Sequence, residues 1–224
     1  MKRTLILGFI LSAAVGFAAE TVNVACIGDS LTQGSGAPED KTYPAQLQAA
    51  LGDGYEVKNF GTGWATALTQ GVTDERGSRN VAYVKSKAYE QSLNYSANVA
   101  IVMLGMNDSK PVNWEKHAQE FEQNLTSIIE GYKKTYVNPT ILLATTPWVA
   151  RDNFEVSGKN VEEQIVPIQR KVAEKTGCTL VDVYAATKDK AELYAEDGIH
   201  LNEKGYETIA KLFADAIRAQ SGKK

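Results

Sequence analysis

Short apolar runs rich in β-branched residues alternate with amphipathic stretches along this chain of 224 residues. In one stretch, 114–132, the apolar side chains fall on a single helical face, and further stretches cover 43–51, 161–176 and 203–220. Parallel strands need a crossover between them, and that crossover is usually a helix. The alternation therefore predicts an α/β fold in which helices cover both faces of a parallel sheet. The five expected strands are residues 22–27, 55–60, 99–104, 140–145 and 179–183.

Residues able to do chemistry follow the ends of these expected strands. Open parallel sheets carry their functional loops beyond the carboxyl ends of the strands. Side chains from distant parts of the chain are therefore expected to meet at one edge of the sheet. In chain order the candidates are Ser30, Gly61 and Gly63, Asn107, Trp148, and finally Asp197 with His200 in the loop before the last helix.

Ser30 can act as a nucleophile only if a base accepts its proton, because a serine hydroxyl reacts poorly at neutral pH. The chain has two histidines, and His117 lies among charged neighbours typical of a solvated helix face. His200 is therefore the candidate base. Asp197 lies three residues before it and can hold the proton of Nδ1, which leaves Nε2 for the serine. Each of these residues also has an alternative, purely structural role: Ser30 could cap a helix, and Asp197 could cap its own loop.

Asn107 and Asp108 follow the third expected strand. An Asn side-chain N–H can donate to the oxyanion of a tetrahedral intermediate, and removing one such donor costs roughly 3 to 4 kcal/mol. The alternative is an Asn-Asp turn before a helix. We assign Asn107 to an oxyanion hole and Asp108 to hydrogen bonds that shape the loop.

Four short blocks follow one another along the chain: Gly28-Asp29-Ser30-Leu31, Asn59-Phe60-Gly61-Thr62-Gly63, Gly105-Met106-Asn107-Asp108 and Asp197-Gly198-Ile199-His200. In order and spacing, and over nearly the whole chain after residue 19, these blocks resemble the GDSL or SGNH hydrolases. The resemblance implies a three-layer α/β/α sandwich with a flavodoxin-like five-stranded parallel sheet. It also implies a catalytic set and an oxyanion hole. The catalytic set is Ser30, Asp197 and His200, and the hole is built from the N–H of Ser30, a glycine N–H and the Asn107 side chain.

The second block departs from the family pattern. Members of this type often read Asn-Phe-Gly-x-Ser-Gly-x-Thr, whereas this chain has Trp64 where the oxyanion glycine is expected. A tryptophan would be strained at a positive φ, so we assign the oxyanion N–H to Gly63, with Trp64 as the alternative. Trp64 is also a candidate wall for a sugar ring, with core packing as the alternative. Trp148 is a second candidate substrate contact.

The N-terminus predicts a secretory signal peptide over residues 1–19. Its first three residues, Met1-Lys2-Arg3, are basic, and the apolar run that follows ends in small residues, so cleavage is expected after Ala18 or Ala19. This run is shorter than the about 20 apolar residues of a membrane span. We expect an exported protein, periplasmic or secreted, with residues 20–224 forming one domain and no stable membrane insertion.

Charge and motifs argue against several other classes of function. The net charge is −3 with both signs interspersed, so nucleic acid is not an expected partner. No metal or organic cofactor is expected, because the sequence lacks metal-ligand spacings and Thr66 takes the third place of a Gly-x-Gly-x-x-Gly signature. Cys26 and Cys178 are expected to be two buried thiols, with a disulfide as the alternative in an exported protein.

A further resemblance narrows the expected substrate. Segments 59–61, 103–110 and 113–114 are similar to bacterial sialate O-acetylesterase-like and carbohydrate acetylesterase members. This similarity implies a serine esterase that removes O-acetyl groups from a carbohydrate, with an acetylated carbohydrate or another small ester as its partner. The alternatives are a lysophospholipase or thioesterase of the same family, and a catalytically idle glycan-binding domain.

Overall fold

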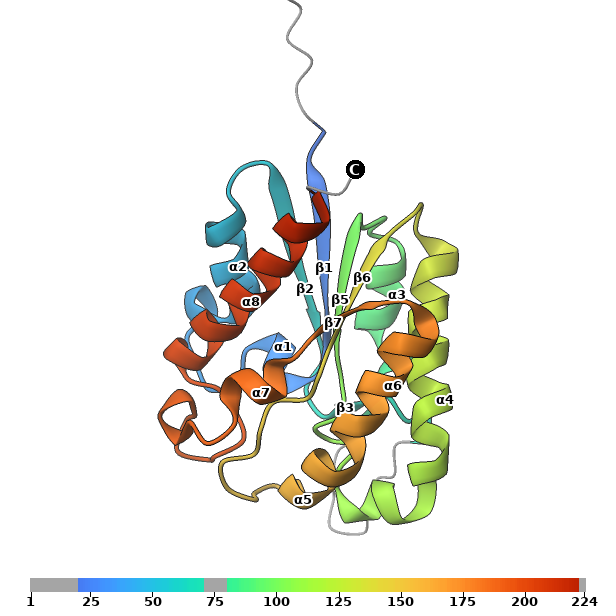
Figure 1. Ribbon diagram of the computed structural model, residues 1–224, viewed down its shortest axis with the longest axis vertical. Helices are drawn as coiled ribbons and strands as arrows, with labels where there is room; N and C mark the ends of the chain where they lie inside the picture. Colours follow the sequence, from blue (N-terminus) through green and yellow to red (C-terminus); the bar gives the residue numbers. More distant parts are fainter. Residues whose placement is uncertain (1–19, 71–79, 222–224) are drawn as a thin grey trace, which may run out of the picture.

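A five-stranded parallel sheet forms the centre of the molecule in the computed structural model, which describes residues 20–70 and 80–221. The strand order is β2-β1-β5-β6-β7 (Figure 1). This is the flavodoxin-like order, with the first strand inside the sheet and the second at its edge, so the expected fold class is confirmed. The strands are β1 (Val22–Gly28), β2 (Tyr55–Gly61), β5 (Val99–Met103), β6 (Thr140–Ala144) and β7 (Thr179–Val181).

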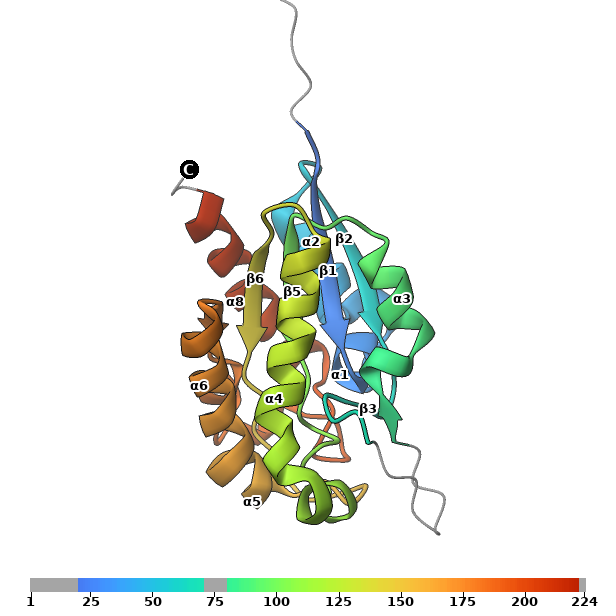
Figure 2. The ribbon, with the colours of Figure 1, turned by 90° about the vertical axis from the view of Figure 1, so that its right-hand side faces the viewer.

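Helices cover both faces of the sheet and give the three layers. Helices α2 and α8 lie on one face, and α3, α4 and α6 lie on the other (Figures 1 and 2). The bounds of these helices are α2 Tyr43–Leu51, α3 Lys87–Leu93, α4 Pro111–Thr135, α6 Val166–Thr176 and α8 Glu203–Ser221. The shorter helices are α1 Ser30–Gln33, α5 Gly158–Asn160, α7 Val183–Thr187, the 3-10 turns η1 Glu39–Lys41, η2 Tyr83–Lys85 and η4 Ala191–Leu193, and the π-helical turn η3 Val161–Ile165.

Strand β1 is buried on both sides, which explains its continuous apolar sequence. Val24 and Cys26 belong to the core beneath α2 and α8, whereas Ala25 and Ile27 belong to the core beneath α4. Side chains alternate between the two faces of a strand, so one short run supplies both cores.

Helix ends follow local sequence signals. Helix α4 begins at Pro111, where a missing N–H costs nothing, three residues before the expected start. Helix α6 ends where Gly177 adopts a left-handed conformation with φ of 67°, as expected. A two-residue parallel pair, β3 (Ala65–Thr66) with β4 (Val81–Ala82), was not expected because two residues carry no periodic signal.

Two expectations lie partly or wholly outside the described residues. The signal peptide of residues 1–19 and its export remain predictions, as does the single domain over 20–224. Among the described helices, none combines the length and the apolar character that crossing a bilayer would demand.

Both cysteines are free thiols, so the expectation of two thiols is confirmed and the alternative of a disulfide is wrong. Cys26 is buried in β1, and this burial raises the pKa of its thiol to about 12. Cys178 is only half-buried, so the expectation of full burial is wrong for it. It lies between the C-terminal end of α6 and the short edge strand β7, where one side remains open to solvent.

Shortening a buried side chain on the central strand β5 should destabilise the protein. Ile101 on β5 is fully buried, with 0% of its surface exposed. We expect Ile101→Ala to lower the free energy of unfolding by about 2 to 5 kcal/mol, measured by urea denaturation. Val137→Ala is the control, because Val137 is 87% exposed and its truncation should change stability by less than about 0.5 kcal/mol. Equal stability of the two variants would contradict the core assignment.

Candidate active site

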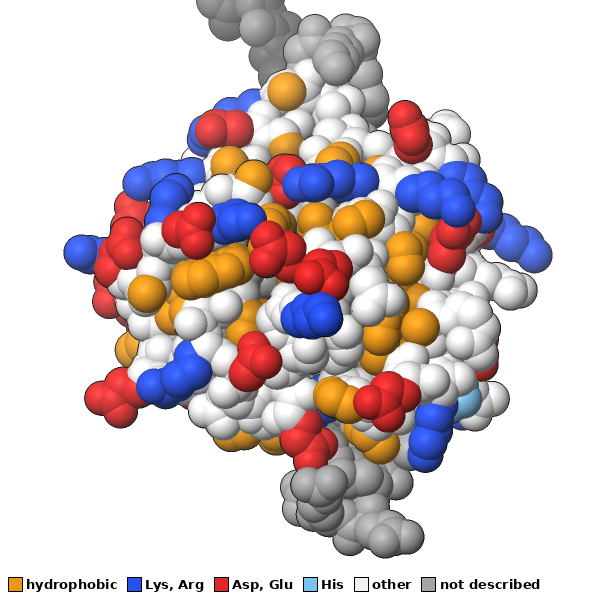
Figure 3. All heavy atoms as spheres, turned by 60° about the horizontal axis from the view of Figure 1, so that its bottom comes forward, with side chains coloured by type: hydrophobic (Ala, Val, Ile, Leu, Met, Phe, Trp, Pro, Cys, Tyr) orange, Lys and Arg blue, Asp and Glu red, His pale blue; other side chains and the backbone are white. Residues whose placement is uncertain are grey.

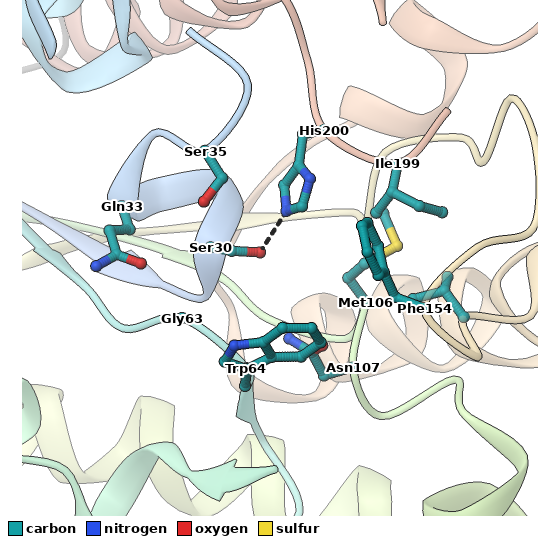
Figure 4. A pocket seen from close by; sticks show the side chains of 11 residues that line it. Ser30, Gln33, Ser35, Gly63, Trp64, Met106, Asn107, Phe154, Ile199 and His200 are labelled. Carbon is teal, nitrogen blue, oxygen red and sulfur yellow. Dashed lines mark hydrogen bonds between the residues drawn. The ribbon is translucent and has the colours of Figure 1, made fainter. Parts of the chain in front are cut away.

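Ser30 and His200 meet at the carboxyl edge of the sheet, although 170 residues separate them. Ser30 is the first residue of α1, with one residue, Asp29, between it and the end of β1, and His200 precedes α8. The Nε2 atom of His200 lies 2.9 Å from the Oγ of Ser30, as the dashed line in Figure 4 marks. The two atoms are within hydrogen-bonding distance, so the serine hydroxyl can donate its proton to the imidazole.

Asp197 holds the other ring nitrogen of His200. Its Oδ2 lies 2.6 Å from Nδ1, and its Oδ1 accepts the backbone N–H groups of Ile199 and His200, both at 2.8 Å. Partial burial alone would raise the pKa of this carboxyl, but the hydrogen bonds from the His200 ring and the two N–H groups outweigh it and lower the pKa. An ionised Asp197 favours the tautomer with a proton on Nδ1, which leaves Nε2 as an acceptor.

The loop after β6 supports the loop that carries Asp197. The backbone N–H groups of Ala150 and Arg151 donate to the carbonyl of Gly198 at 3.0 and 3.3 Å, and the Asn153 side chain donates to the Asp197 carbonyl at 3.2 Å. Gly198 has φ of 76°, and a Cβ there would lie 2.9 Å from the Arg151 nitrogen. Only glycine suits this left-handed and crowded position.

Asp29 performs the capping role that Ser30 could have played. Its buried carboxyl group accepts the backbone N–H of Leu31 at 2.9 Å and caps α1. Ser30 therefore keeps its hydroxyl for His200. Gly28 lets β1 end close to β5, because a Cβ on it would lie 2.5 Å from the Met103 carbonyl oxygen.

Asn107 reaches the same pocket from the loop after β5. Its Nδ2 donates to the Ala65 carbonyl at 3.0 Å, and its own carbonyl accepts the Asn113 side chain at 2.8 Å. An amide nitrogen has two hydrogens, so one donor is left for a substrate oxygen. Asp108 accepts the N–H groups of Ala67 and Leu68 at 3.1 and 2.8 Å, which is the loop-shaping role expected of it.

The second block places both Gly63 and Trp64 on the pocket wall. Trp64, with φ of 66°, has the left-handed conformation that glycine favours, whereas Gly63 is not among the glycines with positive φ. Such a conformation costs a bulky residue on the order of 1 to 3 kcal/mol and persists where the surroundings enforce it. Gly63 and Trp64 thus remain the two candidates for the oxyanion N–H, and the assignment to Gly63 stays a prediction.

The pocket beside Ser30 is small, with a volume of about 100 Å³. Pockets for drug-sized ligands are several-fold larger, at about 300 to 1,000 Å³. Buried apolar side chains form its inner part, and two exposed aromatic side chains stand at its mouth. The described lining residues are Ser30, Gln33, Ser35, Gly63, Trp64, Met106, Asn107, Phe154, Val156, Ile199 and His200.

The loop after β6 contributes two pocket residues that were not expected from the sequence, Phe154 and Val156. Both follow a strand, so the same position beyond a strand end that made Trp148 a candidate could also have pointed to them. Trp148 is not one of the lining residues and packs edge-on against Tyr194, with ring centroids 5.9 Å apart. Its role in substrate binding stays a prediction. His117 lies on α4 with its Nδ1 2.8 Å from Glu120, outside the pocket lining, as its charged neighbours suggested.

Acidic and basic side chains are interspersed over the face where the strands end (Figure 3). The described residues therefore surround the site with no strong electrostatic field of one sign, as the interspersed charges of the sequence predicted. A serine hydroxyl, an imidazole and a carboxylate in line, beside an amide donor and a small apolar pocket, can transfer an acyl group.

Comparison with known proteins agrees with this chemistry. The profile of the GDSL-like Lipase/Acylhydrolase family matches residues 26–208. The chain is 35% identical over 218 residues to a protein named acetylxylan esterase from Xylanibacter ruminicola, covering 89% of this chain and 44% of the relative. This chain thus spans less than half of that relative's length.

Solved structures share the fold. A carbohydrate acetylesterase from Sinorhizobium meliloti superposes with a TM-score of 0.71 at 19% identity, covering 89% of this chain and 100% of the other. An aryl esterase from M. smegmatis superposes with a TM-score of 0.66 at 19% identity, covering 89% and 99%. At this level of identity the likeness concerns the fold alone.

The buried carboxyl of Asp29 should make stability depend on pH. Burial raises its pKa to about 7, against an ordinary value near 3.8, despite the hydrogen bond from Leu31. Between these two values the folded state keeps a proton that the unfolded state has lost, so stability falls as pH rises. Asp29→Asn removes this titration while it keeps an oxygen for Leu31.

We therefore expect the free energy of unfolding to fall more between pH 5 and pH 8 in the unaltered protein than in Asp29→Asn. Urea denaturation at the two pH values measures the difference. Titrating groups that do not interact with Asp29 contribute equally in both proteins and cancel in the comparison. Asp108 does interact with Asp29, and its charge is one of the causes of the raised pKa of Asp29, so the difference reports Asp29 together with this coupling. Identical pH dependence would show that Asp29 is not a buried, protonated cap.

Proposed function

The chain belongs to the GDSL-like lipase/acylhydrolase family, and on that premise we propose that it is a serine esterase that removes O-acetyl groups from a carbohydrate. One observation carries the proposal. The Oγ of Ser30 lies 2.9 Å from Nε2 of His200, whose Nδ1 lies 2.6 Å from Asp197, beside a pocket of about 100 Å³.

In the proposed reaction, His200 takes the hydroxyl proton of Ser30 as Oγ attacks the acetyl carbonyl carbon. The backbone N–H groups of Ser30 and Gly63 and the side chain of Asn107 stabilise the oxyanion. The tetrahedral intermediate collapses as the bond between the acetyl carbon and the sugar oxygen breaks, and His200 gives its proton to that oxygen, which leaves as the sugar hydroxyl. Water, deprotonated by His200, then attacks the acetyl-enzyme, and acetate leaves as Ser30 recovers its proton. Asp197 stays ionised and stabilises the imidazolium.

The size of the pocket supports a short acyl group. Met106, Val156 and Ile199 are buried and line its inner part, where the methyl group of an acetyl would lie in apolar surroundings. A lysophospholipase or thioesterase would need an apolar groove for a long acyl chain, and about 100 Å³ does not offer one. The acetylated substrate is therefore favoured over these alternatives.

The carbohydrate half of the proposal draws support from the relatives. The 35% identical relative is named acetylxylan esterase, and one structural neighbour is named a carbohydrate acetylesterase. The intact Ser30, His200 and Asp197 contacts argue against an idle glycan-binding domain, since binding alone would not need a serine hydrogen-bonded to an oriented base.

Acetate release tests the proposal directly. We expect the protein to release acetate from acetylated xylo-oligosaccharides and from p-nitrophenyl acetate, and to act far more slowly on p-nitrophenyl octanoate. Ser30→Ala and His200→Ala should each lower kcat by about 10³-fold or more, and the double variant should be little worse, because the two residues act as a unit. Faster turnover of octanoate than of acetate would instead favour the lysophospholipase or thioesterase.

Asn107→Ala tests the oxyanion hole. We expect kcat for p-nitrophenyl acetate to fall about 10²- to 10³-fold with little change in KM, because the lost donor acts on the transition state. Urea denaturation of the same variant shows whether the lost bond to Ala65 has unfolded the loop. A folded variant with kcat within threefold of the unaltered protein would remove Asn107 from the hole.

A further inference from the structure

Two aromatic side chains remain exposed at the mouth of the pocket. Trp64 is 39% exposed and Phe154 is 43% exposed, and both line the pocket. They come from the loops after β2 and β6, and their rings meet edge to face with centroids 6.0 Å apart. Single exposed apolar residues are ordinary on a protein surface, but two in contact at the rim of a pocket indicate a binding surface.

Both rings contact other side chains of the site. The Nζ of Lys110 lies 4.4 Å from the centre of the Trp64 ring, and Lys110 is fully buried, so it covers the inner side of the indole. The ring of Phe154 lies 6.1 Å from that of His200. Trp64 and Phe154 also have positive φ, of 66° and 48°. Backbone conformations of this kind are kept at ligand-contacting sites where the surrounding structure enforces them.

The pocket therefore has two parts of different character. The inner part is closed by buried side chains and suits the small acyl half of an ester. The mouth is open, so the larger alcohol half must lie there. In Figure 4, Phe154 lies on one side of the Ser30–His200 pair, and the polar side chains of Gln33 and Ser35 lie on the other.

We infer that Trp64 and Phe154 form the subsite for the alcohol half of the substrate, and that this half is a pyranose ring. The C–H face of the ring packs on the two aromatic side chains, and its hydroxyl groups face Gln33 and Ser35. A sugar ring has both an apolar face and polar edges, so it matches a mouth with one aromatic and one polar side. The inference rests on the proposed function, because it assumes that Ser30 attacks an acetyl group in the inner part.

The test compares a ring-bearing ester with a ringless one. The substrates are acetylated xylo-oligosaccharides and ethyl acetate, and the variants are Phe154→Ala and Trp64→Gly. Glycine at position 64 keeps the left-handed backbone and removes only the indole. We expect kcat/KM for the sugar substrate to fall about tenfold more than kcat/KM for ethyl acetate, mainly through a higher KM.

Two further variants make the comparison specific. Phe154→Tyr retains the ring and should restore most of the sugar selectivity that Phe154→Ala loses. Val137→Ala removes another exposed apolar side chain, outside the pocket lining, and should leave both substrates unaffected. Equal losses on both substrates, or no loss on the sugar, would overturn the subsite.

A binding titration separates this inference from the esterase proposal. We expect unacetylated xylotetraose to bind the Ser30→Ala protein and to bind Ser30→Ala/Phe154→Ala about tenfold more weakly, measured by calorimetry. If the unaltered protein cleaves neither ester, the proposed function fails, yet this titration still decides the subsite. Equal binding to the two proteins, or none to either, would overturn the inference.

Discussion

The parallel register of three neighbouring strands is the constraint on which the site depends. Gly28 at the end of β1 pairs with Gly61 of β2 on one side and Met103 of β5 on the other, so the three strands end at one level. The loops carrying Ser30, Trp64 and Asn107 all start from that level. A Cβ at Gly61 would lie 2.1 Å from the backbone nitrogen of Gln33, so the sheet and α1 can approach only because this residue is glycine. Sheet geometry thus decides which side chains can meet.

Two buried acidic residues, Asp29 and Asp108, hold loops of the site by hydrogen bonds, although burying an acidic group lowers stability. Asp29 and Asp108 are buried, and burial raises their pKa values to about 7 and about 6 although each accepts backbone N–H groups. Burying a carboxyl is unfavourable unless hydrogen bonds compensate. Here the hydrogen bonds hold the turn before Ser30 and the segment after Trp64. The proposed acyl transfer requires Ser30, His200 and Asn107 to keep a narrow range of geometry, and these hydrogen bonds hold the backbone next to Ser30 and Asn107 in place.

Sequence patterns predicted the fold and the candidate residues that follow strands. The inner strands β1, β5 and β6 were found because they are apolar on both faces, whereas the edge strand β2 has exposed polar residues and was found from its β-branched and aromatic content. Ser30, Asn107 and Asp197 with His200 were found because each follows a strand or precedes the last helix. Tertiary packing decided the rest. The second block pointed to position 64 as the place of a positive φ, but the contact of the Trp64 ring with Lys110 joins the loops after β2 and β5, and no local pattern encodes it. Phe154 is one aromatic residue in an irregular loop, and its position beside His200, which makes it a candidate substrate contact, is visible only in the folded structure.

Covalent labelling shows whether the hydroxyl of Ser30 is an activated nucleophile. A fluorophosphonate reacts with such a serine by forming an Oγ–P bond and losing fluoride, and mass spectrometry of the digested protein locates the adduct. We expect one adduct, on the peptide that contains Ser30, and its loss in His200→Ala. An unlabelled protein, an adduct on another residue, or undiminished labelling of His200→Ala would show that Ser30 is not activated by His200.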